Sequence, residues 1–137
     1  MSEKKYKYIT IWDDESHPGI VFGIYSPKLV IDINIAKELV DNRLDYTQGN
    51  PVYTLIDFTN VKSVTKEARD YMNSPEGGLK GLLGGAFLSN NVVATLFVNL
   101  YLRVNSPVIP AKLFTNKTEA INWLNKIKSE KAQLVEV

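Results

Sequence analysis

The stretch LIDFTNVKSVTKEA, residues 55–68, joins the end of an apolar run to the start of a helical pattern. Residues 52–58 are rich in β-branched and aromatic side chains, which is typical of a buried strand. Thr65 has the side chain and the position to cap a short helix that carries Ala68. The stretch therefore predicts one βα unit in which an acid, hydroxyls and lysines follow a buried strand.

Strand and helix patterns alternate on both sides of this unit. Runs of β-branched and aromatic residues predict the strands, and residues with capping side chains precede the helical patterns. The predicted strands are residues 6–12, 20–25, 52–58, 82–89 and 111–115, and the predicted helices begin after Asp32, Thr65, Asn90-Asn91 and Asn116.

The resulting order, ββαβαβαβα, predicts an α/β domain with an N-terminal β-hairpin and a mainly parallel sheet. No linker rich in Pro, Gly or Ser divides the 137 residues, so we expect one domain over residues 1–137. Such sheets bind ligands outside the carboxyl ends of their strands, here after Phe58, Ser89 and Thr115.

The composition excludes several classes of function. With 16 Lys+Arg against 15 Asp+Glu, the net charge of +1 gives no general attraction to nucleic acid or anionic lipid. The absence of cysteine excludes thiol catalysis and disulfides and is compatible with a reducing cytosol. The N-terminus has no signal-peptide pattern, so we expect a cytoplasmic protein.

An uncharged stretch, residues 81–102, is long enough to suggest a membrane span. Gly84-Gly85 and residues 89–91 interrupt its middle with residues that favour strands, turns and caps. We therefore expect a strand followed by a helix there, and no membrane span.

Two groups of short motifs carry a resemblance to a known family. Residues 57–61, DFTNV, followed by residues 64–68, VTKEA, resemble the STAS family, whose anti-anti-sigma members carry an acid, Leu, Ser, any residue and Val before Asp-Ser-Ser-Gly. Residues 112–115, KLFT, and 120–124, AINWL, look like the strand and Ala-x-x-Trp-Leu helix of uncharacterised bacterial STAS/SEC14-like (SpoIIAA-like) proteins. The resemblance covers about residues 50–128 and implies a SpoIIAA-like/STAS-like single domain.

The chain departs from the family at its modification site. In the family, a serine of Asp-Ser-Ser-Gly takes a phosphate from a partner kinase, and this chain has Thr65, Lys66, Glu67 and Ala68 there. Glu67 would repel a phosphate, and only Thr65 or Ser63 offers a hydroxyl nearby. The resemblance therefore implies a regulatory module without the phosphorylatable serine.

Six polar residues follow the strand of the quoted stretch and form the candidate binding set. They could hold a small polar ligand or present a docking edge to a protein partner. Alternatively, and this interpretation is favoured, they pair with neighbouring backbone groups and cap the next helix. The set is Asp57, Thr59, Lys62, Ser63, Thr65 and Lys66.

No catalytic or metal-binding set emerges. His17 is the only histidine, so every Ser-His-Asp or zinc arrangement would depend on it alone. The acids beside it, Asp13, Asp14 and Glu15, occupy consecutive positions of a predicted turn and are expected to be solvated. We expect no metal, no cofactor and no enzymatic activity.

The helix predicted over residues 91–104 has more apolar surface than one sheet would cover. At 100° per residue, one apolar stripe is predicted to face the core and a second flank remains. The flank is expected to meet a neighbouring helix of the same domain, which is favoured, or a second copy or an apolar ligand. The stripe is Val93, Leu96, Phe97, Leu100 and Val104, and the flank is Ala94, Val98 and Leu102.

These observations predict a non-enzymatic, cytosolic, STAS-like interaction module. It would act through residues 59–66 and the Val98/Leu102 flank on a protein partner or on itself as a homodimer, and not on nucleic acid. The alternative, which the resemblance to SEC14-like proteins implies, is a carrier or sensor of an apolar, lipid-like molecule, with residues 81–102 lining a cavity.

Overall fold

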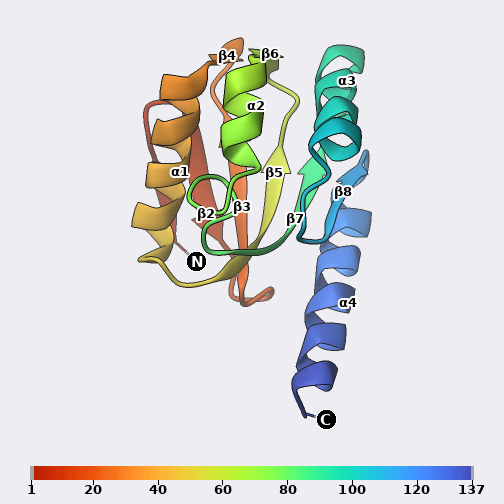
Figure 1. Cartoon of the computed structure of the whole chain (residues 1–137). Helices are drawn as coiled ribbons and strands as arrows, with labels where there is room; N and C mark the ends of the chain where they lie inside the picture. Colours follow the sequence, from red (N-terminus) through yellow and green to blue (C-terminus); the bar gives the residue numbers. More distant parts are fainter. Residues whose placement is uncertain (1, 137) are drawn as a thin grey trace.

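The computed structural model describes residues 2–136, with side chains through residue 132. Residues 1 and 137, the ends of the predicted domain, lie outside the described residues. A six-stranded sheet in the order β1-β2-β3-β5-β7-β8 forms its centre (Figure 1). These strands are β1 (Glu3–Lys5), β2 (Ile9–Asp13), β3 (Ile20–Tyr25), β5 (Val52–Asp57), β7 (Leu82–Leu88) and β8 (Ala111–Phe114).

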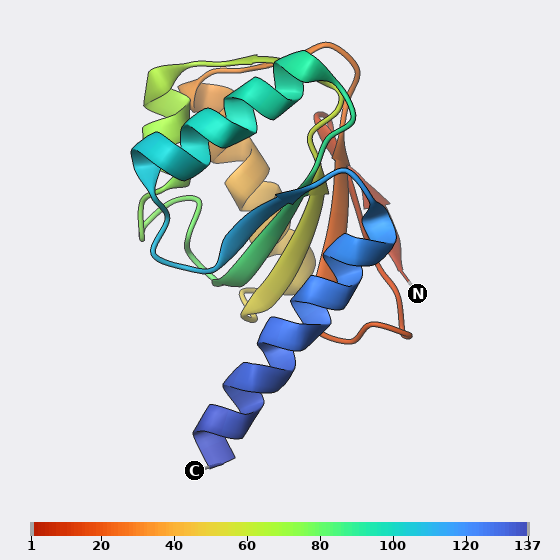
Figure 2. The same ribbon diagram turned by 90° about the vertical axis from the view of Figure 1, so that its right-hand side faces the viewer.

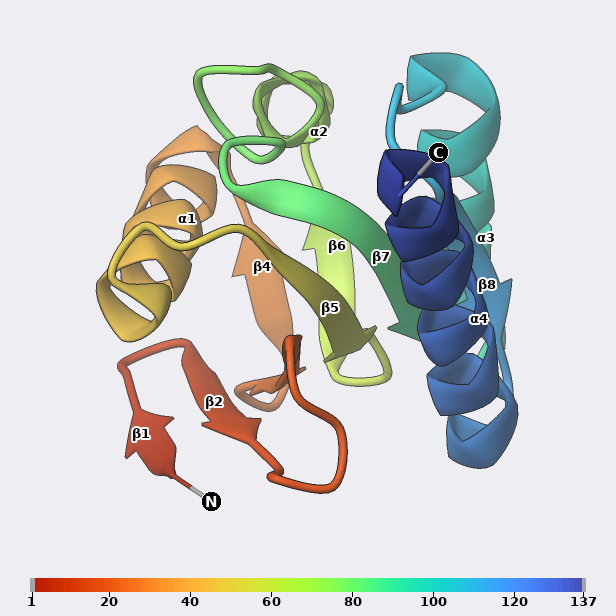
Figure 3. The same cartoon turned by 90° about the horizontal axis from the view of Figure 1, so that it is seen from below.

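The sheet is mainly parallel, as predicted. β3, β5, β7 and β8 run in the same direction, while β1 and β2 add antiparallel pairs at one edge. Seen from below, β1 lies at that edge and β8 at the opposite edge (Figure 3). The strands predicted over residues 52–58, 82–89 and 111–115 are therefore neighbours in one sheet, and the α/β fold class is confirmed.

Helices cover both faces of the sheet. The first three helices lie on one face and α4 lies on the other (Figure 2). The π-helical segment η1 continues α3 directly. The helical elements are α1 (Ile33–Thr47), α2 (Lys66–Met72), α3 (Val92–Leu100), η1 (Tyr101–Asn105) and α4 (Lys117–Glu136).

Alternation along the strands divides the core into two clusters. Ile20 and Phe22 pack with Leu124 of α4, whereas Val21 packs with Val98 of α3. Successive side chains of a strand point to opposite faces, so one strand supplies both clusters. Gly84 brings α4 close to β7, because a Cβ there would lie 3.0 Å from the Ile127 side chain.

The predicted helix caps are present. The side-chain oxygen of Asp32 accepts from the Ile35 backbone N–H at 2.8 Å, and that of Thr65 accepts from Ala68 at 3.1 Å. Asn91 and Asn116 make the same contact three residues ahead, at 2.8 and 3.0 Å. Each bond satisfies an N–H that has no partner within the helix, which fixes where each helix begins.

Three short strands were not predicted. β4 (Leu29–Ile31) and β6 (Val61–Val64) form a separate two-stranded parallel sheet, and β1 precedes the expected hairpin. The first strand of that hairpin begins at Ile9 and not at Tyr6, because the Tyr6 N–H turns back to the Ile9 carbonyl at 2.8 Å. Runs of three or four residues are too short to show a strand period, and β4 and β6 pair residues about 30 positions apart.

The uncharged stretch over residues 81–102 is divided between β7 and α3, as predicted. Within residues 2–136 no helix has both the length and the apolar character needed to cross a membrane.

Candidate functional site

A cavity of about 110 Å³ lies between the sheet and the helices α1, α2 and α3. Its walls come from elements far apart in sequence, including β2, β3, α1, β7 and α3. The lining is mostly aliphatic and aromatic. It comprises Ile9, Ile11, Val21, Phe22, Tyr25, Leu39, Val40, Arg43, Thr54, Ile56, Phe58, Val64, Arg69, Met72, Gly78, Leu79, Leu82, Gly85, Phe87, Phe97, Val98, Tyr101, Pro107, Ile109 and Ala111.

Four aromatic rings in contact form one wall of the cavity. Phe58 lies edge-on to Tyr25 and to Phe87, with centroid distances of 5.4 and 6.0 Å, and Phe87 lies edge-on to Tyr101 at 5.8 Å. Edge-to-face pairs at these distances are favourable and hold the rings in fixed orientations. Space remains beside them partly because Gly85 presents no side chain to the cavity.

Arg43 of α1 is the buried charge of this cavity. Its side chain is 9% exposed, and its Nη2 donates to the Gly78 carbonyl at 3.1 Å. Its Nη1 is buried and has no hydrogen-bond partner. Burial lowers the pKa of the guanidinium to about 10, against the influence of the nearby Tyr25, so Arg43 stays charged at neutral pH.

Four further polar side chains reach the cavity, and the buried Thr54 is one of them. Arg69 of α2 has a buried Nε without a hydrogen-bond partner. Burial raises the pKa of Tyr25 above its ordinary value, and it raises the pKa of the Tyr101 hydroxyl to about 12. Both tyrosines are therefore neutral donors at neutral pH. The site thus combines apolar walls with two cations and three hydroxyls.

The predicted polar set lies elsewhere, on the consecutive elements β5, β6 and α2. The Asp57 carboxylate accepts from the Thr59 N–H at 2.9 Å, Thr65 caps α2, and Lys66 pairs with Asp70 at 2.8 Å. Lys62 and Ser63 belong to β6, which pairs with β4. None of the six lines the cavity. Local capping, the favoured interpretation, accounts for Asp57 and Thr65.

The predicted orientation of the α3 helix is wrong. Ala94 and Val98, expected on a second flank outside the core stripe, are 0% and 2% exposed, and Leu102 packs against the same core, which agrees with the favoured interpretation that this flank is covered within the domain. Leu96, expected in the core, is 64% exposed. Because α3 is apolar on several sides, the 100° rule does not select one face. The small side chain of Ala94 allows close packing on the sheet side, so this flank is covered within the chain.

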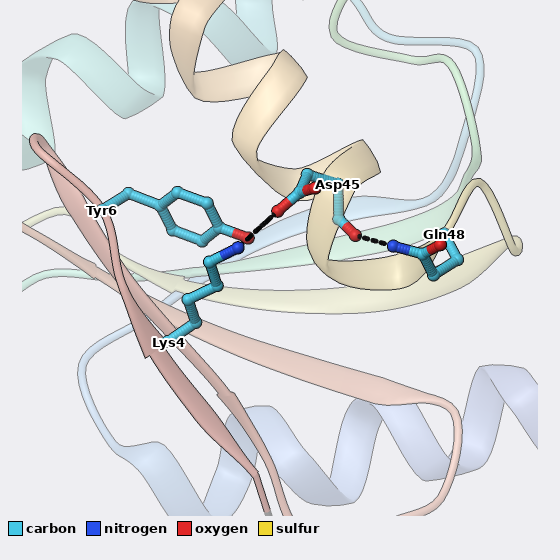
Figure 4. Close-up of polar contacts among 4 residues, drawn as sticks. All are labelled: Lys4, Tyr6, Asp45 and Gln48. Carbon is cyan, nitrogen blue, oxygen red and sulfur yellow. Dashed lines mark hydrogen bonds and ion pairs between the residues drawn. The ribbon is translucent and has the colours of Figure 1, made fainter.

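A second polar group fastens the N-terminal strand to α1 (Figure 4). The Asp45 carboxylate accepts from the Tyr6 hydroxyl at 2.6 Å and from Lys4 Nζ at 2.9 Å, and both bonds lower its pKa. Gln48 donates to the Asp45 backbone carbonyl at 2.7 Å. The carboxylate is therefore already paired, and the contacts secure an edge strand to a helix.

Sequence reasoning missed Arg43, although the sequence carries a signal for it. Arg43 follows Leu39 and Val40 at the spacing of the buried stripe of α1, which also includes Ala36. A charged residue on a core stripe is rarely buried without a partner and marks a position worth inspection. What the sequence could not show is that Gly78, 35 residues away, supplies only one acceptor.

The comparisons with known proteins give a family model and a solved structure of similar fold. A family model described as a domain of unknown function (DUF7793) matches residues 15–128. The chain is similar to an uncharacterised protein of the DUF3478 family with a SpoIIAA-like fold from Shewanella loihica, with a TM-score of 0.60 and 16% identity over 90% of this chain and 98% of that one. This likeness confirms the predicted SpoIIAA-like fold. No curated protein matches the chain.

Proposed function

The chain belongs to the DUF7793 family, a domain of unknown function, and from its geometry we propose that it binds a small apolar molecule in the cavity beneath α1, α2 and α3. It acts as a non-enzymatic, cytosolic carrier or sensor of that molecule. This is the function that the resemblance to SEC14-like proteins implies.

The observation that carries this proposal is the volume of the cavity together with its apolar lining. Protein interiors are packed as densely as organic crystals, and voids larger than a water molecule are few. A space of about 110 Å³ therefore leaves the apolar side chains around it without part of their packing contacts. An apolar ligand that fills the void restores those contacts, whereas water gains little there.

The location of the cavity supports the same function. Leu82, Gly85 and Phe87 of β7 and Phe97 and Val98 of α3 line it, so the uncharged stretch between residues 81 and 102 supplies much of the wall. Ligand sites are typically such apolar concavities with a few placed polar groups.

Filling the cavity is expected to weaken ligand binding at least about tenfold without unfolding the chain. In Val98→Phe, a ring replaces a buried side chain that lines the cavity. Wild type should show saturable shifts of cavity resonances with 1-hexanol in ¹H–¹⁵N spectra. The variant should bind at least about tenfold more weakly, which corresponds to about 1.4 kcal/mol of lost contact. Its free energy of unfolding should be unchanged or raised by about 1 kcal/mol.

Val93→Phe is the matched control, because Val93 is 52% exposed on the same helix and does not line the cavity. It should bind the probe as wild type does. Wild-type protein that gives no saturable shift, or a folded Val98→Phe that binds as well as wild type, would contradict the function. Native mass spectrometry of protein purified from its host should also show an added small-molecule mass.

A second function, self-association, is favoured by the exposed apolar surface of α3 and η1. We name this surface the α3 face, and it consists of Val92, Val93, Leu96, Leu100 and Val104, which are 42% to 76% exposed. Contiguous exposed apolar residues often mark a protein interface. The α3 face takes the place of the predicted flank of Ala94, Val98 and Leu102 in this proposal.

Light scattering after size exclusion tests self-association. Wild type should elute as a dimer at high concentration, and Leu100→Asp should be monomeric because the charge would be desolvated in the interface. Val30→Asp, at a residue 44% exposed on β4 and outside the α3 face, should leave the dimer intact. A monomeric wild type at the highest attainable concentration would exclude this function.

A further inference from the structure

We infer that the cavity ligand is a small apolar carboxylate, whose anionic head pairs with Arg43. This inference rests on the proposed binding function and specifies the chemical class of the ligand. It starts from the one charged side chain that is at least nine-tenths buried and lines the cavity within the described residues.

Arg43 is under-paired within the described part of the chain. A guanidinium has five N–H donors, and Arg43 makes one hydrogen bond, from Nη2 to the Gly78 carbonyl. Its Nη1 is enclosed and unpaired. A buried charge without an opposite charge is costly, so the native complex is expected to provide a partner for it.

No acid of the described residues supplies that partner. The cavity lining contains no Asp or Glu. Neither the Lys4–Asp45 ion pair nor the Lys66–Asp70 ion pair involves Arg43. The lining instead has a second arginine, Arg69, whose buried Nε is also unpaired. The cavity therefore holds a buried positive charge, that of Arg43, inside apolar walls.

A carboxylate fits this environment better than other ligand head groups. Arginine forms strong charge-assisted hydrogen bonds with carboxylates, and the unpaired Nη1 has donors available for one. The Tyr25 hydroxyl lies near Arg43, lines the cavity and can donate to the same head group. The aromatic and aliphatic walls require an apolar body, which excludes small inorganic anions as the preferred ligand.

The experiment compares two probes with the same six-carbon body, hexanoate and 1-hexanol, on the 137-residue chain. Titrations followed by ¹H–¹⁵N spectra at neutral pH should show hexanoate binding about tenfold or more tightly than the alcohol. In Arg43→Met this preference should disappear or reverse, while 1-hexanol still binds. Lys37→Met removes an exposed charge from the same helix and should keep the preference.

The outcomes distinguish failure of the carboxylate assignment from failure of the proposed binding function. If 1-hexanol binds wild type as tightly as hexanoate, the carboxylate assignment fails while the cavity function stands. If neither probe binds, the proposed function fails and the assignment fails with it. If Arg43→Met does not fold, the comparison of hexanoate with methyl hexanoate on wild type decides, because the ester keeps the body and loses the charge. Equal binding of acid and ester would overturn the assignment.

Discussion

Val98→Asp is expected to lower the free energy of unfolding by about 4 kcal/mol or more, which would leave the chain largely unfolded. Val98 is 2% exposed and packs in the core between α3 and the sheet. An aspartate there would lose the apolar contacts of the valine and place a charge among apolar side chains. Circular dichroism and urea denaturation measure the effect.

Leu96→Asp is the matched control on the same helix, two residues away. Leu96 is 64% exposed, so the same substitution type should change the free energy of unfolding by less than about 1 kcal/mol. Both variants are compared at a concentration where each is monomeric, since loss of a dimer would change the apparent stability. Equal destabilisation by the two substitutions, or a larger effect at Leu96, would mean that α3 packs through its other face.

Gly78→Ala is expected to lower the free energy of unfolding by about 3 kcal/mol or more. A Cβ at Gly78 would lie 2.5 Å from the carbonyl carbon of Met72, which ends α2. The clash cannot be relieved by a side-chain rotation, because it is with backbone. The Gly78 N–H also donates to the Tyr71 carbonyl at 3.1 Å, which holds the loop against the helix end.

The substitution should also disturb the cavity, because the Gly78 carbonyl is the hydrogen-bond acceptor of Arg43. Amide shifts around Arg43 should therefore change together with the loss of stability in chemical denaturation. Gly49→Ala is the control, since Gly49 has a φ of +77° but a Cβ added there would meet no atom within 4 Å. Gly49→Ala should lower the free energy of unfolding by only about 1 kcal/mol, because an alanine is unfavourable in the left-handed backbone conformation. A Gly78→Ala variant as stable as Gly49→Ala would show that the loop packs less closely.

Most of the fold was predictable from short-range patterns. The run over residues 52–58 and the glycine-bearing run over residues 82–89 both became strands of the central sheet. Asp32 and Thr65 cap the helices that follow them, as their side chains predicted. These features depend on residues within a few positions of one another, which is the range over which a single sequence is informative.

The candidate site was less predictable, because it depends on which faces of the helices and the sheet pack against one another. The polar set around Asp57 was visible in the sequence but is engaged partly in local caps and pairs. Arg43 was not predicted as a site residue, because its role depends on the residues that surround it in the folded chain. The apolar lining of the cavity and the lack of an acid there are properties of several elements together.

The sequence by itself determined where the strands and main helices lie, how the helices begin, and that the sheet is mainly parallel, because caps, periodicity and the βα alternation are encoded locally. Only the tertiary structure decided which face of α3 is buried, since a helix that is apolar on several sides has no preferred face until it packs. It also decided the pairing of β4 with β6 and the isolation of Arg43, because both arise from contacts between residues about 30 or more positions apart.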